Sequence, residues 1–164
     1  MARREAEKKT GRPTPRRNKP ERPRDELGRP QPWGSPNRLE LEDFDALPLE
    51  ENHRLARAHF NAGRFFPAHE AWETAWKQAR DTEDAEFFKG LSQLGAGYVH
   101  LLRGNRHGAV TLLRRAARRI GRYPPGHRGV DTAGVAAAAR AQADGLERGE
   151  RPVGEDAPVE APTL

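Results

Sequence analysis

The sequence predicts an all-α protein, a compact bundle of two helical hairpins plus a fifth, C-terminal helix, flanked by disordered tails. Apolar residues recur at the spacing of one helix face, and no segment alternates polar and apolar residues as a half-buried strand does. Glycine, proline and capping residues divide the central part of the chain into segments of helical length. A chain of 164 residues then has room for one ordinary domain between two tails.

Composition divides the chain into three regions. Residues 1–37 are rich in Pro, Gly and Arg and have few apolar side chains, so we expect a disordered basic tail. Residues 38–149 carry the helical patterns and form the predicted all-helical domain. Residues 150–164 contain prolines and acidic residues and are predicted to form a disordered acidic tail. Of the 29 Lys and Arg residues, 11 lie within residues 1–31, so the basic charge is concentrated in the first tail.

Boundary signals predict five helices. Pro48 suits the first turn of a helix and Gly63 suits the end of one, while Asp81 or Thr82 can cap the third helix. Gly104 follows that helix, and prolines follow the fourth. The predicted helices cover about residues 48–62, 67–80, 82–103, 106–122 and 131–148.

The first two helices resemble the next two at a spacing of 41 residues. Matching positions include His59 with His100 and Ala68 with Ala109, and a glycine closes the first helix of each pair. This pattern resembles the helical hairpin of tetratricopeptide repeats. Two copies are fewer than a solenoid needs, so a compact bundle of two tetratricopeptide-like hairpins plus a fifth helix is predicted.

The composition also excludes several classes of function. The sequence contains no cysteine, which excludes disulfides, thiolate metal sites and cysteine nucleophiles. No apolar run reaches the length of about 18 residues that suggests a membrane span. The basic N-terminus lacks the apolar stretch of a secretory signal. We therefore expect a cytoplasmic protein that does not associate with membranes.

The segment FPAHEAWETAW, residues 66–76, contains the side chains best suited to form a functional site. At about 100° per residue, one face of its helix carries an imidazole, a carboxylate and two indoles, with Glu70 to one side of that face. A stripe on the next helix combines glycines with two polar side chains. We expect these two faces to meet, with the glycines leaving room for the tryptophans. The pocket candidates are His69, Glu70, Trp72, Glu73, Trp76, Gln93 and His100.

Three interpretations of this group stay open. The favoured one is a buried hydrogen-bond network of His69, Glu73, Gln93 and His100 that fixes how the hairpins cross. The second is a divalent metal site with His69, Glu73 and His100 as ligands. The third is an acid–base pair of Glu73 with one of the two histidines. The remaining histidines at positions 53, 107 and 127 are expected on the surface.

The chain resembles a known family in these same motifs. The residues on which the resemblance depends form the pattern F-x-x-G-x-F-x-x-A-H-E-x-x-E-x-x-W from Phe60 to Trp76. They are followed by F-x-G-L-x-Q-L from Phe88 and H-x-x-R-G-N from His100. This combination is similar to the domain-of-unknown-function family numbered three hundred and nine, a family of small all-helical prokaryotic proteins. The resemblance covers about residues 48–122 and implies an all-α fold but no activity.

The predicted fourth helix carries an arginine face. From Phe87 to Val130 there are nine basic residues and no acidic one. Such a face is either solvated or binds phosphate groups, and with the basic tail it provides a candidate nucleic-acid surface. The outward-facing residues are Arg114, Arg115, Arg118, Arg119 and Arg122.

The favoured function is a non-enzymatic module that binds an unidentified protein and needs no cofactor. One alternative is a small metal-dependent enzyme or metal-binding protein centred on His69, Glu73 and His100. Another is a nucleic-acid-associated protein that uses the basic tail and the arginine face. The sequence offers no evident nucleophile and no phosphate-binding loop, so an enzymatic role is the less favoured interpretation.

Overall fold

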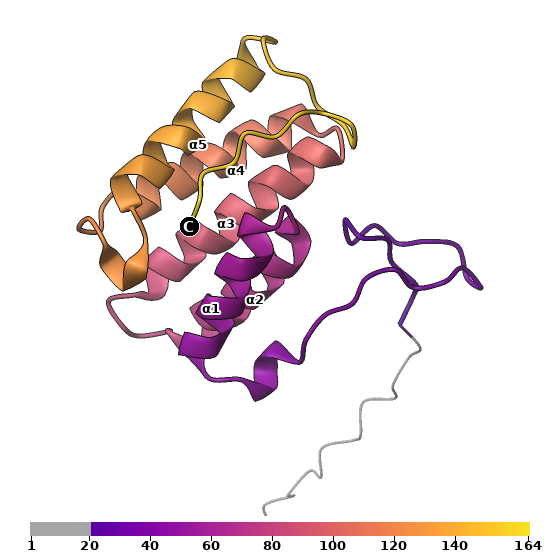
Figure 1. The fold of residues 1–164 in the computed structure, drawn as a ribbon, viewed down its shortest axis with the longest axis horizontal. Helices are drawn as coiled ribbons and strands as arrows, with labels where there is room; N and C mark the ends of the chain where they lie inside the picture. Colours follow the sequence, from indigo (N-terminus) through magenta and orange to yellow (C-terminus); the bar gives the residue numbers. More distant parts are fainter. Residues whose placement is uncertain (1–20) are drawn as a thin grey trace, which may run out of the picture.

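A computed structural model describes residues 21–164, and within this range the regular structure is helical, as predicted (Figure 1). Two short 3-10 helices, Phe44–Ala46 and His127–Gly129, accompany the α-helices. None of the helices described is long and apolar enough to cross a membrane. Residues 1–20 of the predicted basic tail lie outside the described range. The α-helices are α1 (Leu49–Asn61), α2 (Phe65–Gln78), α3 (Ala85–Leu102), α4 (Arg106–Ile120) and α5 (Thr132–Glu147).

Two helices begin at other residues than the sequence indicates. Helix α2 begins at Phe65, two residues before the proline predicted to start it. Pro67 still lies in the first turn, where a backbone N–H has no partner within the helix. Helix α3 begins at Ala85 rather than next to Asp81 or Thr82. Asp81 has a φ of 65°, a left-handed conformation that keeps it out of the helix.

Side-chain caps position the second half of the bundle. The Asn105 side chain accepts a hydrogen bond from the Gly108 N–H at the start of α4, and Asp131 does the same for Gly134 at the start of α5, both at 3.0 Å. Each cap satisfies an N–H group that the first helical turn leaves without a partner. The caps therefore fix where α4 and α5 begin after their loops.

Each α-helix packs against the next one along the chain, with α3 in the centre (Figure 1). The glycines of α3 allow α4 to approach, which corrects the expectation that they make room for tryptophans. A Cβ atom at Gly97 would lie 2.8 Å from the Leu113 side chain, and one at Gly90 would lie 3.0 Å from Ile120. An apolar stripe of α3 is fully buried, and it contains Phe87, Leu91, Leu94, Tyr98 and Leu101.

Residues 150–164 follow a defined path, which differs from the predicted disordered tail. After α5 the segment turns back and runs across α4 and α3 towards α1, as the yellow trace in Figure 1 shows. Val153 and Val159 pack partly against the core, and Leu164 is buried. Apolar side chains at intervals in an otherwise acidic segment provide the contacts that hold it, and the composition as a whole conceals them. We call residues 150–164 the C-terminal strap.

Residues 21–37 also contact the domain, although the predicted disordered region extends to residue 37. Arg103 donates a side-chain hydrogen bond from Nε to the Leu27 carbonyl at 3.0 Å. Gly28 has a φ of 74° and lies so close to the Phe66 ring that a Cβ atom would overlap it. A glycine therefore lets this arm lie against the start of α2.

Candidate functional site

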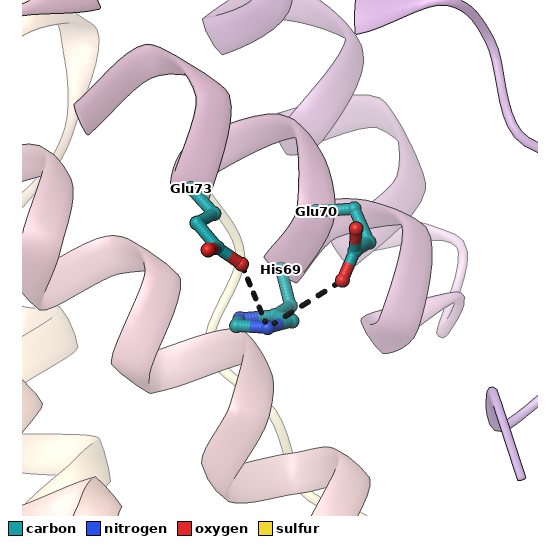
Figure 2. Close-up of side chains that lie close together, drawn as sticks. All are labelled: His69, Glu70 and Glu73. Atoms are coloured by element: carbon teal, nitrogen blue, oxygen red, sulfur yellow. Dashed lines mark ion pairs between the residues drawn. The ribbon is translucent and has the colours of Figure 1, made fainter. Parts of the chain in front are cut away.

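Three side chains of α2 converge at the predicted motif (Figure 2). His69 Nε2 lies 3.5 Å from an oxygen of Glu73, one turn later, and 3.7 Å from an oxygen of Glu70. The other carboxylate oxygen of Glu73 pairs with Lys77 at 3.3 Å. All three converging side chains are partly exposed, so the group lies at the edge of the bundle and is accessible to solvent.

Helix α3 orients the imidazole of His69 from the opposite side. Nδ1 lies 3.0 Å from both the carbonyl oxygen and the hydroxyl of Ser92. A Cβ atom at Gly95 would lie 3.0 Å from the His69 backbone, so the missing side chain allows the two helices to approach here. When Nδ1–H donates to the Ser92 carbonyl, the Nε2 lone pair faces the two carboxylates. That is the orientation in which a histidine serves as a metal ligand.

The predicted network of His69, Glu73, Gln93 and His100 does not form. The Gln93 side chain accepts a hydrogen bond from Arg119 of α4 at 3.1 Å. His100 lies 3.0 Å from the Asn105 side chain through Nδ1. Burial, followed by the charges of Arg103 and His69, lowers the pKa of His100. The four residues are thus divided between two helix pairs, because Gln93 points to α4 while His69 packs on Ser92. His69 and Glu73 are also only partly buried, which corrects the prediction of a buried group.

The predicted metal ligands are only partly brought together. His69 and Glu73 are close as expected, but the third convergent residue is Glu70, predicted to lie to one side. One ligand atom from each of the three lies within 4.8 Å of the others, whereas His100 is not part of this group. The side chain of Glu70 reaches back along the helix surface to its neighbour, which the angular position of its Cα does not reveal.

The two tryptophans of the motif do not form a shared pocket. Trp72 is fully buried in the core, and its Nε1–H donates to His53 Nδ1 at 3.1 Å. Trp76 is half-buried, and the Lys89 ammonium lies 5.1 Å from its ring centroid. Trp72 therefore contributes to packing, and Trp76 interacts with a cation beside the His69 group.

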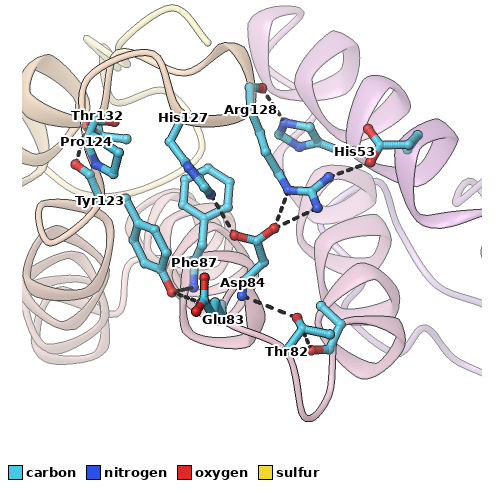
Figure 3. A network of polar contacts seen from close by, with 12 residues as sticks. His53, Thr82, Glu83, Asp84, Phe87, Tyr123, Pro124, His127, Arg128 and Thr132 are labelled. Carbon is cyan, nitrogen blue, oxygen red and sulfur yellow. Dashed lines mark hydrogen bonds and ion pairs between the residues drawn. The ribbon is translucent and has the colours of Figure 1, made fainter.

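A partly buried polar network joins the helices at the opposite end of α2 (Figure 3). His53, expected on the surface, is 4% exposed, and its Nε2–H donates to the Arg128 carbonyl at 3.0 Å. Burial is the main cause that lowers the pKa of His53. Burial raises the pKa of Asp84, but hydrogen bonds from Arg128 and His127 outweigh it and leave that pKa below its usual range. His127 was also expected on the surface, and it lies 2.6 Å from Asp84.

Tyr123 completes the same network. Its hydroxyl accepts a hydrogen bond from the Phe87 N–H at 3.0 Å and donates to the Glu83 carbonyl at 2.6 Å. Thr132 in turn donates to the Tyr123 carbonyl at 2.9 Å (Figure 3). These contacts connect the start of α3 with the loop between α4 and α5. We assign a structural role to the network, since its members satisfy one another.

The arginine face of α4 is partly neutralised within the molecule. Arg114 pairs with Asp144 at 3.0 Å and with Glu147 at 2.6 Å, both on α5. Arg119 pairs with Glu86 at 2.9 Å. The exposed remainder, for which no ion pair occurs within residues 21–164, consists of Arg115, Arg118 and Arg122.

A second candidate site lies where the C-terminal strap meets α1. The Asn61 side chain donates to the Leu164 carbonyl at 2.6 Å and accepts from the Leu164 N–H at 2.8 Å. Beside this contact is a cavity of about 370 Å³ lined by strap residues and by Phe60, Phe65 and Leu102. Asn61 lies within the span of the sequence motif but was not predicted as a site residue. Its position two residues before Gly63, on the exposed end of α1, is the one signal that could have indicated it.

One comparison with known proteins finds a similarity to a family over part of the chain. Residues 53–112 match the family model described as Domain of unknown function (DUF309), which confirms the predicted resemblance. The match includes His69, Glu70 and Glu73 and excludes α5 and the C-terminal strap. No curated protein and no solved structure matches the chain.

Proposed function

Since the DUF309 match implies no activity, we propose from the geometry that this domain is a protein-interaction module that binds an extended polypeptide segment beside Asn61. One observation carries the proposal: the Asn61 side chain pairs with both main-chain polar groups of Leu164. A side-chain amide that donates to a carbonyl and accepts from an N–H recognises backbone and does not depend on the residue bound. Asn61 is thus suited to holding an extended chain.

Specificity would come from the apolar surface next to Asn61. The Leu164 side chain is 8% exposed, whereas Val159 and Ala161 pack only partly against the core. Main-chain hydrogen bonds combined with side-chain pockets are a common way to bind extended peptides. In this proposal, the two hydrogen bonds from the Asn61 side chain to the bound backbone give affinity. The apolar surroundings of the Leu164 side chain select an apolar residue at that position.

A fluorescent peptide with the sequence of residues 151–164 tests this function. We expect saturable binding to the full chain carrying Leu164→Asp, a change that weakens the resident strap. A control peptide with Asp in place of its leucine should bind at least about tenfold more weakly, because burying a leucine contributes about 1.5–3 kcal/mol. Adding Asn61→Ala to the protein should weaken its affinity for the unmodified peptide by about tenfold, since the substitution removes two hydrogen bonds. Equal binding of both peptides would exclude a specific groove.

The His69 group supports a second candidate, the binding of a divalent transition metal. Tetrahedral zinc sites place neighbouring nitrogen and oxygen ligands about 3.4 Å apart, given bonds of about 2.1 Å. The distances of 3.5 and 3.7 Å from His69 Nε2 to the two carboxylates are close to that spacing. The Ser92 carbonyl contacts the other ring nitrogen, as backbone carbonyls do for histidines that bind metals through their free nitrogen. Solvent or a substrate would complete the coordination.

Metal analysis of the full chain tests this candidate. After chelator treatment and dialysis against zinc or manganese, we expect a stoichiometric metal content in the unmodified protein. His69→Ala should lose the metal, while the exposed His107→Ala serves as the matched control and should retain it. Circular dichroism establishes that the variants are folded. Metal retained equally by His69→Ala, or absent from the unmodified protein, would exclude the site.

A further inference from the structure

We propose that the C-terminal strap is a built-in competitor for the groove beside Asn61, and that the partner offers an acidic, extended segment with an apolar anchor. This inference rests on the proposed function and adds its regulation and the chemistry of its ligand. The strap is the segment that occupies the groove in the structure, and its last described residue makes the Asn61 contact. A partner segment can bind there only if the strap leaves.

Few polar contacts attach the strap to the helices. The Gly154 N–H donates to the Leu101 carbonyl at the end of α3 at 2.9 Å, and Arg106 donates to the Arg151 carbonyl at 2.8 Å. From there to Leu164, the one hydrogen bond between two main-chain groups among the described residues is internal, from the Ala157 N–H to the Gly154 carbonyl. The middle of the strap is therefore held by partly buried apolar side chains and by the ion pair of Glu155 with Arg29.

The strap also fills the groove incompletely. The cavity of about 370 Å³ lies between strap residues and the rings of Phe60 and Phe65. Tyr98 packs on both rings, and its hydroxyl is buried with no hydrogen-bond partner among residues 21–164. A better-fitting segment can therefore gain contacts that the strap does not make, both with atoms lining the cavity and with the polar groups exposed there.

Charge defines the chemistry of a competing segment. Glu155 of the strap pairs with Arg29 of the N-terminal arm, whereas the pair of Glu160 with Arg151 lies within the strap itself. The adjoining cavity of about 930 Å³ is lined by Arg29, Arg38 and Arg64, by Asp25 and Glu26, and by Glu155 of the strap. A segment that replaces the strap would meet these arginines, which favours acidic residues near its apolar anchor.

Attachment to the same chain makes the strap an effective competitor. A tethered ligand acts at an effective concentration in the millimolar range for a short flexible connection. A free segment of equal intrinsic affinity then binds with an apparent dissociation constant equal to the intrinsic one divided by the fraction of molecules whose groove is open. The strap thereby sets a threshold of affinity that a partner must exceed.

The experiment compares the same fluorescent peptide, residues 151–164, on three full-length proteins. These are the unmodified chain, Leu164→Asp, which removes the anchor, and Gly154→Pro, which removes the N–H bonded to Leu101 and cannot adopt the φ of 123° found there. We expect both variants to bind the peptide at least about tenfold more tightly than the unmodified chain. The double variant Asn61→Ala, Gly154→Pro should not show this increase in affinity for the peptide.

Each outcome separates the two proposals. Equal affinities for all three proteins would overturn the competition while leaving the peptide groove intact. Absence of binding by the two variants, with their helical content unchanged by circular dichroism, would overturn the proposed function and this inference with it. Tighter binding by only one of two folded variants would contradict a single strap that closes the groove as a unit.

Discussion

At the scale of residues, the unexpected feature is that the most deeply buried imidazole lies outside the predicted site. Both ring nitrogens of His53 are used, with Nδ1 accepting from Trp72 and Nε2–H donating to the Arg128 carbonyl. A neutral ring satisfies both contacts, whereas a protonated Nδ1 would direct an N–H group at the indole N–H. His53 is therefore a structural histidine that has to stay neutral.

We predict that this histidine makes the fold sensitive to acid. Burial, the largest cause, places the folded-state pKa of His53 below the unfolded value of 6.5. The unfolded chain then binds the proton first, so the stabilisation is complete above about pH 6.5 and is lost as the pH falls from there towards the folded pKa. The slope approaches about 1.4 kcal/mol per pH unit for one such group. Urea unfolding at pH 7.5, 6.5 and 5.5 measures it.

The control is His53→Phe, which fills similar space without a titrating group. It should lower the free energy of unfolding at pH 7.5 by about 1–3 kcal/mol, because the Trp72 N–H loses its partner. It should also flatten the decline below pH 6.5, leaving the contribution of His100, whose pKa is lowered as well. An unchanged slope would show that His53 is not responsible.

At the scale of elements, close helix contacts depend on glycines and caps. Gly97 lets α4 approach α3, since a Cβ atom there would lie 2.8 Å from Leu113. Glycine costs about 1 kcal/mol of helix propensity relative to alanine, and packing of the neighbouring helix offsets it. The caps on α4 and α5 then determine where each helix begins, which in turn sets the register of that packing.

We predict that the α5 cap contributes measurably to stability. Asp131→Ala leaves the Gly134 N–H without its side-chain acceptor and should lower the free energy of unfolding by about 0.5–2 kcal/mol. Asp131→Asn retains the acceptor oxygen, so its free energy of unfolding should stay within a few tenths of a kcal/mol of that of the unmodified protein. Chemical denaturation of the three proteins measures both changes. Equal losses in the two variants would attribute the effect to charge rather than to the cap.

At the scale of the whole molecule, the strap and the helical bundle differ in how they are held. Helix α3 is buried on nearly all sides, whereas the strap is attached through a few hydrogen bonds and partly buried side chains. Segments held in this way open with less free energy than the global unfolding of the domain. The molecule is thus a stable helical core with a less stable covering segment.

Native-state hydrogen exchange should resolve these two levels. We predict that the amides of Gly154 and Leu164 exchange through a local opening, while the amide of Leu94 in α3 exchanges only on global unfolding. Asn61→Ala should accelerate exchange at Leu164 and leave Leu94 unchanged, because Asn61 contacts the strap and lies on an exposed helix end. A uniform acceleration at all three amides would indicate that the strap belongs to the cooperative core.

The sequence by itself determined the helices, because their signals are local. Apolar spacing and the glycines after α1 and α3 act within a few residues of each boundary. The same reasoning placed His69 and Glu73 together, since residues four apart lie on one side of a helix.

Only the tertiary structure decided which faces meet and which groups are buried. Gln93 bonds to Arg119 rather than to His69, and His53 is buried by a loop far along the chain. The seating of Leu164 against Asn61 joins residues 103 positions apart. Helix periodicity specifies a face but not its neighbour, and the neighbour depends on how side chains and glycines of several helices fill space together.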